Sequence, residues 1–384
     1  MQPMTLVSRE QQSHRGPRMG ARKFAILGVI ALGVVATAVR AIDDVSLQIE
    51  SVEGDGWVAN GVAVDLGLPS ETTTVRAKVA RLQVKALGQT LTDIRIECPK
   101  LELGDERIAC AQARVLADWP TLGKQTLTVG LVYGRRDGSL DVAVDGVRVG
   151  EGRLALQAAL RDGGWNARAK LQKVPVDRLV KLAQDFKLPL PPITATGLVD
   201  LSITARGKET NLSAASIEAS LIDLTANNES GSLASDKLSL QLQATVRGSP
   251  KEWVFDVTLK SSQGQAFAQP IFVDLSAHAV ELTASGKLRN SSVLTLDRFA
   301  LDHTDVARAS GRAQVDFKQE QPVRALQMQL DALKFPGAYE SYFQPLLLDT
   351  SLQALQTSGS IAGTMAVENG EPQNIDLSFG NVSF

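Results

Sequence analysis

The stretch of sequence that decides the fold is 238–246, which reads LSLQLQATV. Apolar residues occupy every second position, namely Leu238, Leu240, Leu242, Ala244 and Val246, and polar residues stand between them. Because successive side chains of a β-strand point to opposite faces, this stretch predicts a strand with one apolar and one polar face. Such strands are typical of an antiparallel sheet that is dry on one side and wet on the other.

The same alternation recurs from about residue 45 to the end of the chain, and short turn sequences such as Arg135–Ser139 and Arg161–Gly164 separate the runs. We count roughly twenty strands, joined mostly in sequence as a meander. That number is too large for one flat sheet, so the predicted sheet is elongated and must curl, split or close. The apolar face of this sheet is expected to be lined by Val199, Leu201, Ile203, Leu238, Leu240, Leu242, Val246, Phe255, Val257, Leu259, Val315, Phe317, Leu326, Met328 and Leu330.

Two segments break the alternation and predict short helical insertions. Residues 176–186 read VDRLVKLAQDF, with apolar residues at helical spacing, and the proline-rich 188–192 ends the helix, so we place a helix within 174–192. Residues 338–355 contain Pro345 and predict two short helices within 336–356. The β-rich part is thereby divided into 43–173, 193–335 and 357–384.

A glycine follows each of these segments, Gly197 after the first and Gly359 after the second. The spacing suggests an internal repeat of about 160 residues, a helix followed by a run of strands. Turns and helix ends recruit glycine in any case, so the sequence leaves both interpretations open.

The N-terminal part carries an apolar run, Phe24–Val39, preceded by Arg22 and Lys23. At 1.5 Å per residue, sixteen residues span about 24 Å, slightly less than a hydrocarbon core of about 30 Å. We expect a transmembrane anchor over 24–42, a basic cytoplasmic tail over 1–23, and the bulk of the chain outside the cytoplasm. The alternative is a signal peptide cleaved near Val39-Arg40-Ala41, which would also export the body.

The two cysteines, Cys98 and Cys110, lie in IECPKLELGDERIAC and are symmetric about Gly104. A hairpin turning at residues 103–105 would set them directly opposite each other, within reach of a disulfide. An exported protein favours a disulfide over a metal or redox site, with two free buried thiols as the alternative. Pro99 cannot donate to a strand ladder and predicts an edge strand or a bulge.

A search for catalytic motifs finds no P-loop, no GxGxxG after a strand, no HExxH and no GxSxG, so we expect no enzyme and no metal or cofactor. His14 lies in the basic tail, and His278 is expected to face solvent from a strand. Residues 302–305 read DHTD, and we interpret them as a polar turn rather than a cation site. A net charge of −2 argues against nucleic acid as a partner.

The predicted apolar face is large, and only two short helical segments are available to cover it. Aromatic residues make up 5% of the chain, so the lining is mostly Leu, Val, Ile and Ala. Such a face can form the core of a closed β-sandwich, or it can line a groove that holds something apolar, with the helical segments as gates. The first arrangement fits a membrane-anchored structural or envelope-assembly protein, and the second fits a lipid-binding protein.

In these features the chain resembles the N-terminal part of the bacterial AsmA-like proteins, most closely the YdbH type, which is related to TamB. The likeness rests on the basic-flanked N-terminal anchor, the run of alternating strands, the cysteine hairpin, and KLPLPP followed by Gly197–Leu201. It implies a single-pass inner-membrane protein with a cytoplasmic N-terminus and a periplasmic β-sheet folded into a hydrophobic groove. In that family phospholipid acyl chains are thought to slide along the groove between the two membranes.

The resemblance also implies a partner, a small outer-membrane lipoprotein, besides phospholipid and the inner membrane. YdbH-type proteins are usually much longer than 384 residues. We therefore expect the present chain to correspond to the membrane-proximal part of such a protein.

Overall fold

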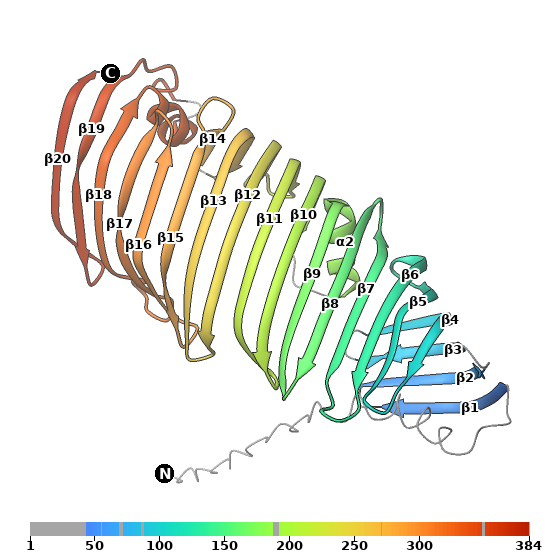
Figure 1. Ribbon diagram of the computed structural model, residues 1–384. Coiled ribbons are helices and arrows are strands. Elements are labelled where there is room, and N and C mark those ends of the chain that lie inside the picture. The colour runs from blue at the N-terminus through green and yellow to red at the C-terminus, as the bar shows by residue number, and fades with distance from the viewer. Residues whose placement is uncertain are drawn as a thin grey trace, which may run out of the picture.

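The computed structural model describes residues 44–54, 56–68, 72–85, 88–186, 192–269, 271–347 and 350–383. These residues form one antiparallel sheet of twenty strands, which extends as a twisted, curled band from β1 to β20 (Figure 1). The predicted tail 1–23 with His14, the predicted anchor 24–42, and residues 187–191 of the predicted first helical segment lie outside the described residues. In the described ranges, no helix combines the length and apolar character needed to cross a membrane.

The sheet falls into three runs of strands in chain order. The first run is β1 (Asp44–Gly54), β2 (Trp57–Gly67), β3 (Thr73–Val84), β4 (Gln89–Leu103), β5 (Arg107–Trp119), β6 (Gly123–Gly134), β7 (Leu140–Val149), β8 (Gly152–Arg161) and β9 (Gly164–Pro175). The second is β10 (Ile193–Lys208), β11 (Asn211–Asn228), β12 (Leu233–Ser249), β13 (Glu252–Ala268), β14 (Ile271–Asp274), β15 (Val280–Arg289), β16 (Val293–His303), β17 (Ala307–Asp316) and β18 (Val323–Phe335). The last is β19 (Ser358–Glu368) and β20 (Glu371–Ser383).

Each strand pairs with the strand that follows it, so the chain is a meander, as the sequence predicts. The exception is β13, whose last residues pair with the short β14 and whose first residues pair with β15. With β14 and β15 sharing one position, the sheet extends for about 85–90 Å at about 4.8 Å per strand. Among the described residues, β1 and β20 lack a partner on their outer sides, so the sheet is open rather than closed.

Two helical insertions interrupt the meander, close to where the sequence places them. Helix α2 (Val176–Asp185) lies between β9 and β10, and the helical turns η2 (Tyr339–Phe343) and η3 (Gln344–Leu346) lie between β18 and β19. Both insertions lie at the same long margin of the sheet (Figure 1). The strands on either side of each insertion are hydrogen-bonded to each other, so the three predicted β segments form one continuous sheet.

Gly197 and Gly359 occupy matching positions after the two insertions, 162 residues apart (359 − 197). Both have positive φ, +125° and +98°, and both lie at a register shift opposite a residue with positive φ, Asp223 (52°) or Asn381 (51°). A Cβ would lie 2.9 Å from the Ile222 carbonyl oxygen at the first position and 2.5 Å from that of Asn381 at the second. Gly264 also has positive φ and lies at a register shift opposite Lys237 (48°), so this geometry does not distinguish an internal repeat from ordinary bulges.

The predicted disulfide between Cys98 and Cys110 is confirmed, with the Cα atoms 6.2 Å apart. The expected register is wrong, however, because the turn is Gly104–Arg107 and not 103–105, so Cys110 pairs with Leu101. A bulge at Pro99, in the interior strand β4, and a second bulge in β5 bring the two cysteines together. Both are buried, at 4% and 7% exposure, in a cluster with Leu66, Leu101, Ile108 and Ala113.

We expect reduction of this disulfide to lower the free energy of unfolding of the β1–β6 region by about 3 kcal/mol, the loop-closure value for a link spanning 12 residues. Urea unfolding with and without a reductant measures the effect. A Cys98→Ala/Cys110→Ala variant is the control and should not respond to the reductant. An equal response of both proteins would contradict the prediction.

Candidate apolar binding face

The register of the strands places the apolar residues of successive strands in rows across one face of the sheet. Paired residues point to the same face, so each row can be followed from strand to strand. One row passes through Leu201 and runs from β7 to β20: Val147, Leu154, Leu171, Leu201, Ala219, Leu242, Leu259, Leu282, Leu301, Ala309, Leu330, Gly363 and Leu377. A parallel row passes through Ile203, Val257 and Met328 and ends at Ile375.

Fourteen of the fifteen residues predicted to line the apolar face lie together on this face, on β10, β12, β13, β17 and β18. The exception is Phe317, which follows the end of β17 and is 62% exposed. Val199 and Leu238 are nearly buried, at 8% and 7% exposure, whereas the other twelve are half-buried. Side chains with this exposure contact their neighbours within the sheet but are not covered by a second layer.

The fifteen predicted residues leave out the row members on the other strands, β7–β9, β11, β15, β16, β19 and β20, and β16 shows one reason. Leu294 and Leu296 alternate with polar residues, but a bulge follows them, and the apolar phase resumes at Phe299 and Leu301. The bulge shifts the alternation by one residue, so a strict period of two hides the continuity of the face. The bulge itself, Asp297-Arg298, is the available signal, because two charged residues in succession interrupt an otherwise alternating run.

The two helical insertions cover only one margin of the apolar face. Beside α2, Val149 and Val174 are 3% and 0% exposed, and beside η2, Val306 and Ala338 are both 0% exposed. Away from this margin, central residues such as Leu242 remain half-buried. The covered margin is therefore a packed edge. The face is open over the central strands, whereas its β2–β5 part is buried in the cluster around Cys98 and Cys110.

A buried polar cluster lies under η2. His303 is 1% exposed and ends β16 in an apolar row between Val280 and Ala307, and its Nδ1 lies 2.7 Å from the Tyr342 hydroxyl. Burial lowers the pKa of His303 to about 4, with a further contribution from His278, and burial raises the pKa of Tyr342. The predicted polar turn is therefore correct only from Thr304 onward.

His278 also departs from its prediction. It lies in the turn between β14 and β15, half-buried, with its ring edge-on to that of His303 at 6.0 Å between centroids. Its Nδ1 and the Nε2 of His303 are buried without a hydrogen-bond partner among the described residues. Both histidines are covered because η2 folds back over this margin of the sheet. Tyr342 of η2, which contacts His303, lies 39 residues after it in the sequence.

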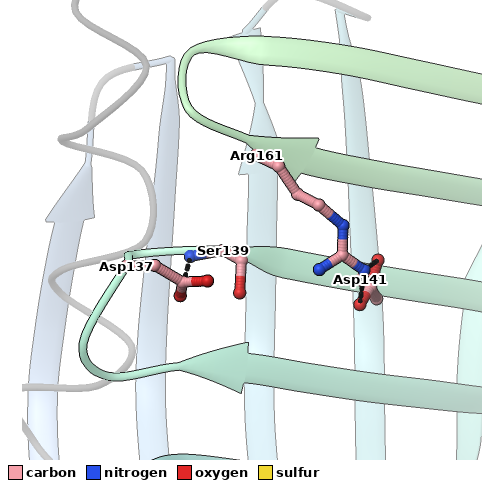
Figure 2. Close-up of polar contacts among 4 residues, drawn as sticks. All are labelled: Asp137, Ser139, Asp141 and Arg161. Carbon is pink, nitrogen blue, oxygen red and sulfur yellow. Dashed lines mark hydrogen bonds and ion pairs between the residues drawn. The ribbon is translucent and has the colours of Figure 1, made fainter.

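The opposite face of the sheet is polar and carries cross-strand ion pairs. Lys260 contacts Glu281 at 2.9 Å, and Arg161 on β8 contacts Asp141 on β7 at 2.7 Å (Figure 2). In the turn before β7, the Asp137 carboxylate accepts a hydrogen bond from the Ser139 backbone N–H, which lowers the pKa of Asp137. Opposite charges on neighbouring strands stabilise the pairing modestly and keep this face wet.

The hollows of this sheet include several on the polar face. One of these, about 660 Å³, crosses β8–β12 and is lined by both signs of charge, including Arg153, Lys170, Asp200 and Glu218. The apolar rows instead form an extended surface, so the site best suited to an apolar ligand is the face as a whole. Comparison of the chain with models of known protein families, with curated proteins and with solved structures finds no match.

Proposed function

We propose that the protein is a lipid conduit, anchored in an inner membrane, that moves phospholipids towards the outer membrane along the apolar face of its sheet without covalent chemistry. The observation that carries this proposal is the row of aliphatic residues that runs from β7 to β20, with a glycine at one position, Gly363, on a face left open over its central strands. Contiguous apolar surfaces larger than a few hundred Å² mark binding sites for protein or lipid.

The direction of the rows fits movement along the sheet. The rows cross the strands along the long dimension of the sheet and cover about 60 Å of it, from β7 to β20, so acyl chains can pass from one strand to the next without leaving apolar contact. The opposite face is polar and ion-paired, which keeps the lipid on one side. Each step exchanges one aliphatic contact for another, so no single position holds the lipid tightly.

The start of the sheet fits an entry at the membrane. Strand β1 begins at Asp44, two residues after the proposed anchor 24–42, so the β1 end of the sheet would stand next to the inner membrane. The proposed function is the one implied by the resemblance to AsmA-like proteins of the YdbH type. It includes a small outer-membrane lipoprotein as a binding partner. It also keeps the single-pass topology with a periplasmic body.

The competing proposal, a structural or envelope-assembly protein, was coupled to a closed β-sandwich core. The described residues form one open sheet instead, so no second sheet packs on the apolar rows within that part of the chain. A purely structural role would leave a large apolar face exposed to water, which favours aggregation. The lipid conduit explains the same face without that liability.

A photo-crosslinking amino acid tests the proposal. Placed at Leu242, in the middle of a row, it should crosslink phospholipid in intact cells, because acyl chains pass within contact distance. Placed at Gln243, the next residue on the same strand, it points to the polar face and serves as the matched control. The readout is phospholipid covalently attached to the purified protein.

Lipid attached equally at both positions would show non-specific contact with membrane, and lipid attached at neither would show that the face is empty. Either result would overturn the conduit.

A further inference from the structure

Three arginines stand around one hollow of about 430 Å³ on the polar face: Arg168 on β9, Arg206 on β10 and Arg247 on β12. The remaining polar lining consists of uncharged side chains from the five neighbouring strands β8–β12, namely Gln157, Asn166, Thr204, Ser216 and Thr245. Among the residues that the structure describes, no carboxylate lines this hollow. Its charge is therefore of one sign, in contrast to the mixed lining of the 660 Å³ hollow beside it.

The strand register shows why the hollow exists. Arg206 pairs with Ala214, and Ala214 pairs with Arg247, so the two arginines flank a residue with a single methyl group. One row further in, Arg168 pairs with Thr204, which begins a row of three hydroxyl side chains. The methyl group leaves space between the guanidinium groups, and the hydroxyl row forms one wall of that space.

The charges at this hollow are not balanced within the described part of the chain. The side chains of Arg168 and Arg206 have no ion pair or hydrogen bond there, and the only ion pair of Arg247 is with Asp256 at 3.9 Å. On the same face Arg161 is held by Asp141 at 2.7 Å and Arg289 by Glu252 at 2.6 Å. Three cations on one patch of the sheet, with little negative charge beside them, create a positive potential that favours a bound anion.

We propose that this hollow binds a phosphate group of a polar ligand. Guanidinium groups bind phosphate oxygens through paired N–H donors, and the threonine and serine hydroxyls can donate to the remaining oxygens. The site lies on the face opposite the apolar rows, so it is separate from the proposed lipid path and does not depend on it. The phosphate can belong to a free phosphorylated solute or to the headgroup of a lipid in a membrane.

The test uses two probes, glycerol 3-phosphate and vesicles of phosphatidylglycerol, with the natural chain and with Arg206→Gln/Arg247→Gln. We expect the double substitution to weaken phosphate binding at least tenfold, because two charge-assisted contacts are lost. Arg168→Gln alone should weaken it by a smaller factor. Calorimetry measures the first probe and co-sedimentation the second.

The matched control is Arg161→Gln, an arginine of the same face whose partner is Asp141, and its binding should equal that of the natural chain. Binding of glycerol 3-phosphate without vesicle binding identifies a free ligand, and arginine-dependent binding of both identifies a headgroup. No binding of either probe to the natural chain, or an equal loss in the control, overturns the proposal. The arginine substitutions should leave phospholipid crosslinking at Leu242 unchanged. A failure of the phosphate site can therefore be told apart from a failure of the conduit.

Discussion

A carboxylate at position 242 is expected to reduce the phospholipid carried by the protein at least tenfold while leaving the sheet folded. Leu242 lies in the middle of its row, between Ala219 and Leu259, and is half-buried. In the empty protein an Asp side chain there can reach water, so folding is little affected. When an acyl chain covers the position, the charge loses its water, at a cost of several kcal/mol. Mass spectrometry of lipid bound to the purified Leu242→Asp variant measures the loss.

The matched control is Gln243→Asp, which adds the same charge on the polar face of the same strand. Leu242→Val removes volume without adding charge and should retain lipid. Circular dichroism checks that all three variants remain folded. If Leu242→Asp retains as much lipid as Gln243→Asp, the apolar face is not the lipid path.

A conduit and a set of independent binding sites differ in how charges combine. In a conduit every lipid passes every row position, so one charge at Leu242 or at Leu259 already blocks transport and the double variant is no worse. If the sites were independent, each substitution would remove only the lipid bound at its own site, and the losses of the two single variants would add in the double variant. This distinction follows from the serial arrangement of the row and needs no knowledge of the lipid.

The strands and their two faces could be predicted from the sequence because both depend on local spacing. Alternation with period two shows in the sequence itself, and a meander needs no long-range information to bring neighbouring strands together. For this reason the segment around Leu242 could be assigned to the correct face from nine residues alone.

Register could not be predicted with the same success, because it depends on turn length and on bulges. The cysteine hairpin shows this: symmetry about Gly104 predicts direct opposition, but the turn Gly104–Arg107 moves the partner of Cys110 to Leu101. The disulfide still forms, since bulges in both strands compensate. On β16, the bulge after Leu296 hid the phase of the apolar face in the same way.

The burial of His303 could not be predicted from the neighbouring sequence. The other three residues of 302–305 are polar and suggest an exposed turn. Burial comes from η2, which is distant in sequence and places the Tyr342 hydroxyl against the ring. The parity of the strand was the available signal, because His303 is two residues from Leu301 and therefore shares its face.

Acidification is expected to loosen η2 from the sheet through His303. The pKa of His303 is about 4 in the folded protein, against 6.5 for a histidine in water, because burial disfavours the charged ring. The unfolded segment therefore binds a proton first as the pH falls. The stabilisation that rests on neutral His303 is complete above pH 6.5 and is lost between pH 6.5 and 4, by about 3 kcal/mol at pH 4. Amide hydrogen exchange of residues 335–347, corrected for its intrinsic pH dependence, measures the opening free energy.

The control is His303→Gln, which keeps a hydrogen-bonding group near Tyr342 but does not titrate in this range. The pH dependence of the variant is subtracted from that of the natural chain, which removes the contributions common to both proteins. The difference that remains belongs to His303. If both proteins open to the same extent at pH 4, the imidazole is accommodated as a cation and η2 is held by its apolar contacts with Val306 and Ala338 alone.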